Sequence, residues 1–369
     1  MLRRFYVGLI LFAACAEQVE TSSVSAGAGA NGGAGGAPDV SVGVGGSTAD
    51  CECVPGDHND RIYTLSDDGQ IWSFDPNDND FTYVRNLLCT GAETPYSMAI
   101  DRTGQAWVVS VDTGLVFVLA LDEMQGCTVS AYTPHQASFD LFGMAFARPD
   151  PTRCEQLYVH SYSGDGPFSE GPNAGELGVI DPESGVLTLL GSVDYDGGEL
   201  AGTGNGRLFA LAGVNPVKLI EYDPSNATAL GTLPLDGLEK TNASAFAFYA
   251  GDFYVFTEAI PPSCMPCMMS ACSTELQACL ADPMCKQQLD CALAQGDIND
   301  ECGGGMPTAM QACLSIDCGS ECMIPSSAKV SQVTRVDYDG SQNFEVVVPQ
   351  APIRIVGAGV SVCVPAVAK

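Results

Sequence analysis

The chain has 369 residues, of which 45 are acidic and 15 are basic, so its formal net charge is −30. A surface this negative repels phosphate backbones, which excludes nucleic acid from the expected partners. The charge is compatible with solubility outside a cell, with calcium binding or with a cationic partner.

Residues 1–14 have the pattern of an export signal. Arg3 and Arg4 precede an apolar stretch of about ten residues, which is too short to span a bilayer as a helix. Two small residues stand before Cys15, and the segment resembles the lipobox of bacterial lipoproteins, although Phe12 replaces the usual Leu. That resemblance implies a lipid on Cys15 and a place at the bacterial outer membrane or cell surface. The alternative is an ordinary secretory signal with an unlipidated cysteine.

Residues 15–50 follow as a tether that contains little besides Gly, Ala, Ser and Val. Such a segment cannot bury enough apolar surface to offset its backbone entropy, so we expect it to be disordered.

Five similar phrases recur after the tether, each with an acid at a turn and then alternating apolar residues. An apolar strand precedes each acid, and further upstream lies a strand with an aromatic residue near its start. A small apolar strand comes before that one in four of the units, so each unit is predicted to contain four short strands. The turn acids are Asp75, Asp122, Asp181, Asp223 and Asp337, and the aromatic residues are Tyr63, Trp107, Tyr158, Phe209 and Tyr254.

Four-stranded units that repeat every ~40 to 60 residues are typical of a β-propeller. The first unit lacks its small strand, and an unpaired strand remains at residues 356–365. If that strand completes the first unit, the all-β fold is a closed five-bladed propeller over residues 51–261 and 326–369, with six blades as the alternative. A sandwich or jelly roll does not explain the matched missing and surplus strands. The repeat resembles propellers of the YVTN/WD40-like superfamily.

Residues 262–325 interrupt the fifth unit between its second and third strands. Ten of the 17 cysteines lie here, and the apolar spacing becomes helical. Export favours disulfides over a zinc site built on the Cys264 and Cys267 pair and the Cys318 and Cys322 pair. The segment resembles Cys-rich helical modules of bacterial surface lipoproteins, a resemblance that implies no activity.

Disulfide partners are predicted from nested pairs of cysteines in the insert and from the order of strands in the propeller. An antiparallel helical hairpin in the insert would join Cys279 to Cys285 and Cys272 to Cys291. In the propeller, the turns that carry Cys127 and Cys154 open on one face of adjacent blades, so these two could bridge. Cys363 ends the closing strand beside the entry of the chain, where Cys51 or Cys53 could lock the ring; Cys53 is our choice.

No catalytic signature occurs in the sequence, and we expect no cofactor. The segment 75–80 (DPNDND) is the strongest alternative for calcium, although its acids are first of all turn residues. A glycoside hydrolase would need two carboxylates ~5 to 9 Å apart at the mouth of the central channel. The available acids there are Glu93, Asp140, Glu199 and Glu239. We expect that these four do not converge.

The two longest connections, residues 161–176 and the Cys-rich insert, both join second to third strands and therefore open on one face. Long loops on a rigid scaffold usually carry function. The sequence therefore predicts a surface-tethered binding or adhesion module for a protein or glycan, rather than an enzyme. A carboxylate-dependent glycoside hydrolase, or another propeller hydrolase, is the alternative, and the oligomeric state is left open.

Overall fold

The computed structural model describes most of the chain after residue 50. The described residues are 51–122, 126–149, 154–163, 169–213, 216–238, 241, 243–259, 264–295, 306–322, 329–338 and 343–365. The predicted export signal, Cys15 and the tether lie outside them, so the lipid anchor remains a prediction. Within the described part of the chain, no helix is long and apolar enough to cross a membrane.

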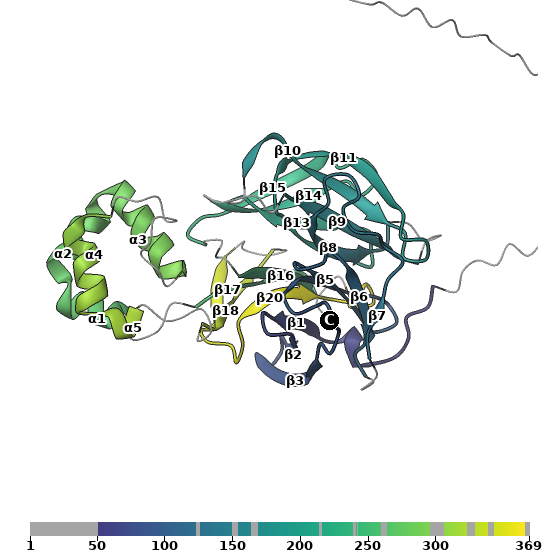
Figure 1. The fold of residues 1–369 in the computed structure, drawn as a ribbon, viewed down its shortest axis with the longest axis horizontal. Helices are drawn as coiled ribbons and strands as arrows, with labels where there is room; N and C mark the ends of the chain where they lie inside the picture. Colours follow the sequence, from purple (N-terminus) through teal and green to yellow (C-terminus); the bar gives the residue numbers. More distant parts are fainter. Residues whose placement is uncertain are drawn as a thin grey trace, which may run out of the picture. The chain divides into compact units, whose positions relative to one another are not determined.

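Twenty strands form five four-stranded antiparallel sheets in the described residues, and these sheets are the blades of a five-bladed β-propeller (Figure 1). The predicted fold class is thus confirmed. From the centre outward, blade 1 contains β20 (Ile355–Gly359), β1 (Ile62–Ser66), β2 (Gln70–Asp75) and β3 (Asp80–Asn86), after the short helix η1 (Asp57–Asn59). Blade 2 contains β4 (Pro95–Ile100), β5 (Gln105–Ser110), β6 (Val116–Ala120) and β7 (Thr128–Val129). Blade 3 contains β8 (Leu141–Ala147), β9 (Gln156–Tyr162), β10 (Glu170–Ile180) and β11 (Leu187–Tyr195). Blade 4 contains β12 (Glu199–Gly202), β13 (Leu208–Ala212), β14 (Val217–Tyr222) and β15 (Ala229–Leu235). Blade 5 contains β16 (Ser244–Tyr249), β17 (Asp252–Glu258), β18 (Ser331–Val336) and β19 (Phe344–Val348).

The ring closes through β20, as the sequence predicted. This strand from the end of the chain pairs antiparallel with β1, where Tyr63 lies opposite Gly359 and Leu65 lies opposite Gly357. Figure 1 shows the yellow β20 beside the purple β1. Because β20 supplies the missing inner strand of blade 1, β1 has no unpaired edge facing the channel.

Each pair of neighbouring blades encloses its own hydrophobic core. Side chains alternate along a strand, so Phe209 packs against blade 5 while Ala210, the next residue in β13, packs against blade 3. Five such clusters, one for each pair of adjacent blades, follow the ring. The repeated aromatic residue of each second strand belongs to one of them, and full burial of a Phe side chain contributes roughly 1.5 to 3 kcal/mol.

Glycines let the inner strands approach one another at the centre. A Cβ atom on Gly143 would lie 2.3 Å from the carbonyl oxygen of Gly198, and one on Gly202 would lie 2.1 Å from that of Phe146. Gly143 is near the start of β8 and contacts the start of β12, whereas Gly202 ends β12 and contacts the end of β8. The inner strands therefore run parallel, and all five begin on the same face of the propeller.

The repeated acids have the turn role that the sequence predicted. Asp181 accepts hydrogen bonds from the backbone N–H groups of Glu183 and Ser184 at 3.0 and 2.8 Å. Asp223 accepts from the hydroxyl and the N–H of Ser225 at 2.6 and 2.8 Å. These hydrogen bonds, to Ser184 and to Ser225 respectively, lower the pKa of each carboxyl group below its ordinary value.

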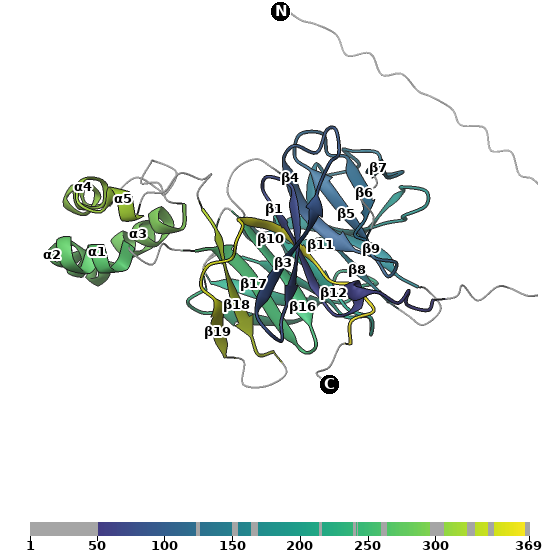
Figure 2. The same ribbon diagram turned by 90° about the horizontal axis from the view of Figure 1, so that it is seen from below.

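The insert between β17 and β18 is helical, with a core of its own. Its helices are α1 (Cys264–Ala271), α2 (Ser273–Ala281), α3 (Pro283–Gln295), α4 (Thr308–Ile316) and α5 (Gly319–Cys322), shown in Figure 2. Buried Met268, Leu276, Leu289 and Leu314 pack there among half-cystines. Most residues of this core are half-cystines and methionines. A module this small cannot build a large apolar core, so the disulfides supply the stability that such a core would give.

Four disulfides lie in the described part of the insert: Cys264–Cys322, Cys267–Cys318, Cys272–Cys313 and Cys279–Cys285. The bridge between Cys279 and Cys285 agrees with the prediction. The predicted pairing of Cys272 with Cys291 is wrong, because Cys272 bonds to Cys313 of α4, a helix that the two-helix hairpin did not include. The four cysteines of the zinc alternative form two of these disulfides.

Three further disulfides lie in the propeller: Cys51–Cys154, Cys53–Cys363 and Cys89–Cys127. The predicted lock between Cys53 and Cys363 is present. The predicted bridge between Cys127 and Cys154 is wrong. Cys127 packs with Cys89 in the core between blades 1 and 2, whereas Cys154 meets the entering segment at Cys51.

The predicted long connection at residues 161–176 is partly a strand. β10 already begins at Glu170, which lies opposite Tyr195 of β11, so the outer hairpin of blade 3 is extended. The sequence in this segment, rich in Gly, Ser and Pro, had predicted a loop.

Gly202→Ala should lower the free energy of unfolding by about 1 to 3 kcal/mol, because the new methyl group overlaps the Phe146 carbonyl oxygen. Gly231→Ala in the outer strand β15 is the control, since no atom lies within 4 Å of a Cβ atom there. Urea denaturation of both variants measures the difference. Equal stability of the two variants would contradict the close approach of the inner strands.

Candidate functional site

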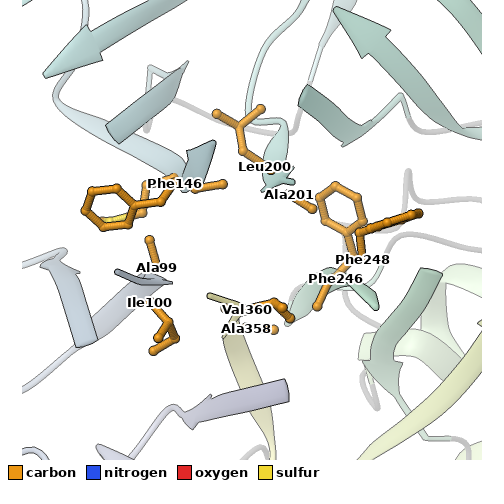
Figure 3. Close-up of a pocket in the computed structure, with 14 residues that line it drawn as sticks. Ala99, Ile100, Phe146, Leu200, Ala201, Phe246, Phe248, Ala358 and Val360 are labelled. Carbon is orange, nitrogen blue, oxygen red and sulfur yellow. The ribbon is translucent and has the colours of Figure 1, made fainter. Parts of the chain in front are cut away.

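The central channel is narrow and apolar. Figure 3 shows Ala99, Phe146, Ala201, Phe246 and Ala358, one from each inner strand, around the central space. None of the 14 residues that line this space has an ionisable or hydroxyl side chain. Side chains that could hold a ligand or move a proton must therefore lie at the ends of the channel.

The mouth face is defined here as the face on which the inner strands begin. It also carries the connections between second and third strands and those that lead into each inner strand. The first residues of the inner strands are Pro95, Leu141, Glu199, Ser244 and Ile355.

Glu199 and Ser97 form a buried polar contact at the mouth. The Ser97 hydroxyl donates to Glu199 Oε2 at 2.8 Å and accepts from the Met144 N–H at 3.2 Å. Ser97 is fully buried and Glu199 is 6% exposed. This contact joins blades 2 and 4, which are not neighbours in the ring, so the glutamate side chain reaches across the strand of blade 3 where the channel opens.

Two tyrosines stack beside this contact. The rings of Tyr96 and Tyr162 are 5.8 Å apart and nearly parallel, and they join blade 2 to blade 3. Burial raises the pKa of Tyr96 well above its ordinary value, and the charge of Glu199 raises it further. The phenol therefore stays protonated and can donate a hydrogen bond at any physiological pH.

A buried ion network holds the junction of blades 5 and 1 on the same face. Glu258 Oε1 lies 2.7 Å from the guanidinium of Arg354, and Glu258 Oε2 lies 3.4 Å from Lys329 Nζ. Arg354 also reaches Asp67 Oδ2 at 2.9 Å. Glu258 ends β17 and Lys329 stands two residues before β18, so the pair closes the base of the insert.

Exposed carboxylates surround these buried groups. Five connections on the mouth face each contribute one: β1–β2, β3–β4, β5–β6, β7–β8 and β15–β16. We call them the rim acids, and they are Asp68, Glu93, Asp112, Asp140 and Asp236. In contrast, the cations Lys329 and Arg354 of this face are already neutralised by Glu258 and Asp67.

The carboxylates proposed from sequence bond to different partners. Glu93 accepts from the Gly91 N–H at 3.1 Å, Asp140 pairs with His135 at 2.7 Å, and Glu199 bonds to Ser97. None of these bonds joins two of the three, and Glu239 lies outside the described residues. Sequence reasoning missed Ser97, although a serine inside an otherwise small apolar inner strand was a usable signal.

The possible calcium segment is used as a turn. Asp75 accepts from the Asn77 N–H at 2.9 Å and forms an ion pair with Arg61. Among the described residues, no group of three or more His, Cys, Asp or Glu side chains is arranged to hold a metal ion. Calcium binding at this segment stays a prediction.

The opposite face has a half-buried carboxyl group, that of Glu155. Glu155 accepts a hydrogen bond from the Arg102 N–H at 3.0 Å, and its Oε1 atom lies 3.8 Å from Arg102 Nε. Burial, assisted by the charge of Asp101, raises the pKa of Glu155 to about 8. The folded state therefore favours the protonated acid at neutral pH.

Comparison with known proteins does not identify a family. No protein-family model matches the chain, and no curated protein matches it. Among solved structures, the chain is similar to one chain of a structure titled "Crystal structure of Nidogen/Laminin Complex", with 14% identity and a TM-score of 0.36. The match covers 53% of this chain and 67% of that chain. A likeness this weak carries no argument about function.

Ser97→Ala should lower the free energy of unfolding by about 1 to 3 kcal/mol, because the buried Glu199 carboxyl loses a donor and the Met144 N–H loses its acceptor. Ser73→Ala, which removes a partly exposed hydroxyl from β2, should change it by no more than ~0.5 kcal/mol. Chemical denaturation at pH 7 compares them. A Ser97 variant as stable as the Ser73 variant would show that the mouth contact is not formed.

Glu155→Gln should become more stable relative to the wild type as pH rises from 5 to 8.5. Folding raises the pKa of the Glu155 carboxyl group from 4.5 to about 8. The protonated group therefore stabilises the folded state fully below about pH 4.5, and this stabilisation falls as pH rises and is lost once pH passes through 8. The amide does not titrate, so the difference between the proteins should shift by at least about 1 kcal/mol in favour of the variant. Unfolding curves at the two pH values measure it, with exposed Glu183→Gln as the control. A shift no larger than that of the control would contradict the burial of Glu155.

Proposed function

We propose that this chain is an extracellular binding module that docks a cationic protein or peptide on its mouth face. Seven disulfides in the described residues are typical of a protein exported to an oxidising compartment. The proposal includes attachment to a bacterial surface through a lipid on Cys15.

The observation that carries the proposal is the set of rim acids. Five exposed carboxylates come from five separate connections, each fixed by a rigid blade, while the cations Lys329 and Arg354 on this face are engaged. The five rim acids together create a negative potential over a broad surface, and they do not line a single pocket. Such a field attracts a positively charged surface, accelerates its encounter and repels anionic partners, including acidic glycans.

Binding is favoured over hydrolysis by the geometry of the channel and its mouth. The channel wall is apolar, and the candidate carboxylates Glu93, Asp140 and Glu199 are each held by a different partner. A glycosidase needs two carboxyl groups set on either side of one sugar bond. No observation favours that arrangement here.

The insert is proposed as a second contact for the same partner. Its surface exposes several large apolar side chains, a feature typical of interaction sites. Three of them are methionines, whose flexible side chains can adapt to the shape of a partner. These exposed residues are Met265, Met269, Leu280, Met284 and Ile316.

Neutralising rim acids should weaken binding of a cationic probe more than neutralising acids elsewhere. The test variant is Asp68→Asn/Glu93→Gln/Asp112→Asn, in which the amides keep the oxygen acceptors of the local turns. We expect about a tenfold weaker affinity for a fluorescent octalysine peptide at 50 mM salt, measured by anisotropy, since three close charges are removed.

The control has the same net charge. Asp78→Asn/Asp80→Asn/Glu183→Gln removes three exposed acids from the β2–β3 and β10–β11 hairpins on the opposite face, and it should change the affinity less than twofold. If the two triple variants lose the same affinity, the probe senses net charge alone and the mouth face is not the binding surface.

A further inference from the structure

The disulfides of the insert differ in the access that they give to solvent. Among the four in the described residues, three have both sulfur-bearing residues buried. The exception is Cys267–Cys318, in which Cys318 is fully buried and Cys267 is partly exposed. A thiol from solution can therefore reach this disulfide at the Cys267 sulfur.

The same disulfide touches a second one inside the core. Cys318 Sγ lies 3.9 Å from Cys272 Sγ, and Cys272 is bonded to Cys313. Cys272 and Cys318 are both completely shielded from solvent. A thiolate released on Cys318 would have Cys272 within van der Waals contact and no water around it.

We propose that these two disulfides form a thiol–disulfide exchange relay, which captures a thiol at Cys267 and delivers a free thiol at Cys313. In the first step an external thiolate attacks Cys267 Sγ. A mixed disulfide forms on Cys267, the bond to Cys318 breaks, and its electron pair leaves on the Cys318 sulfur as a thiolate.

In the second step the Cys318 thiolate attacks Cys272 Sγ. A Cys272–Cys318 bond forms, the Cys272–Cys313 bond breaks, and Cys313 leaves as a thiolate that takes a proton from water. Each step exchanges one disulfide for another, so the relay needs no oxidant or reductant besides the incoming thiol. The number of disulfide bonds is unchanged.

The substrate class is a cationic thiol. Cys267 Sγ lies 3.5 Å from the backbone oxygen of Asp317, whose side chain is exposed. The described part of the insert has one basic residue, Lys286, against five acids. These acids are Glu275, Asp282, Asp290, Asp317 and Glu321. An aminothiol is attracted by this charge, whereas an anionic thiol is repelled.

The relay is tested on the full oxidised chain with cysteamine as the incoming thiol. The reaction is stopped with acid, free thiols are alkylated, and bridges are mapped by mass spectrometry without reduction. We expect cysteamine on Cys267, a new Cys272–Cys318 bridge and alkylation of Cys313. Cysteamine should react at least threefold faster than 2-mercaptoethanesulfonate.

Three results would overturn the proposal. They are alkylation of Cys318 with Cys272–Cys313 intact, absence of the adduct from Cys267, and equal rates for the two thiols. The Cys272→Ser/Cys313→Ser variant keeps the entry disulfide and removes its acceptor, so its alkylated thiol should remain on Cys318. The buried Cys279–Cys285 bridge should stay intact throughout and serves as the internal control. Because the wild-type map decides the question, poor folding of the variant does not affect it, and the outcome is independent of what the mouth face binds.

Discussion

The pairing of β20 with β1 is the constraint on which this structure depends. Each blade buries its faces against two neighbours, so an incomplete ring would expose the cores on both sides of the gap. The last strand of the chain completes the first blade, and the Cys53–Cys363 bridge joins the two ends of the folded chain next to it. In the chain-entropy model, a loop that spans 310 positions makes such a bridge worth about 6 kcal/mol. Closure thus fixes the positions of the inner strands, on which the groups at the mouth are placed.

Close packing of the inner strands determines where polar groups can be placed. Glycine and alanine at the centre bring strands so near that the channel is apolar and narrow, as at Gly202 and Ala358. Polar side chains are displaced to the starts of the strands, where Glu199 reaches Ser97 two blades away. The exposed acids lie outside this layer on loops whose ends the blades hold rigidly. The proposed binding surface is therefore a consequence of ring closure rather than of any single pocket.

Much of this fold could be predicted from sequence because its causes are local and repeated. Alternating strands, Asp-rich turns and the surplus strand at the end of the chain predicted five blades and their closure. The disulfide between Cys279 and Cys285 was also predictable, since it spans the short turn at Asp282 between two antiparallel helices, with the two cysteines six positions apart. Cys272 and Cys127 were assigned wrong partners because their true partners approach through tertiary packing that spacing does not encode. The contact of Ser97 with Glu199 escaped prediction for the same reason.

Hydrogen exchange followed by mass spectrometry tests ring closure most directly. Peptides that cover Ile355–Gly359 and Ile62–Ser66 would be compared in the oxidised protein under native conditions. If β20 is the inner strand of blade 1, both peptides should be protected to the same degree and should lose protection together as denaturant is added, because they open as one unit. Rapid exchange of residues 355–359 while residues 62–66 stay protected would contradict closure of the propeller by its last strand.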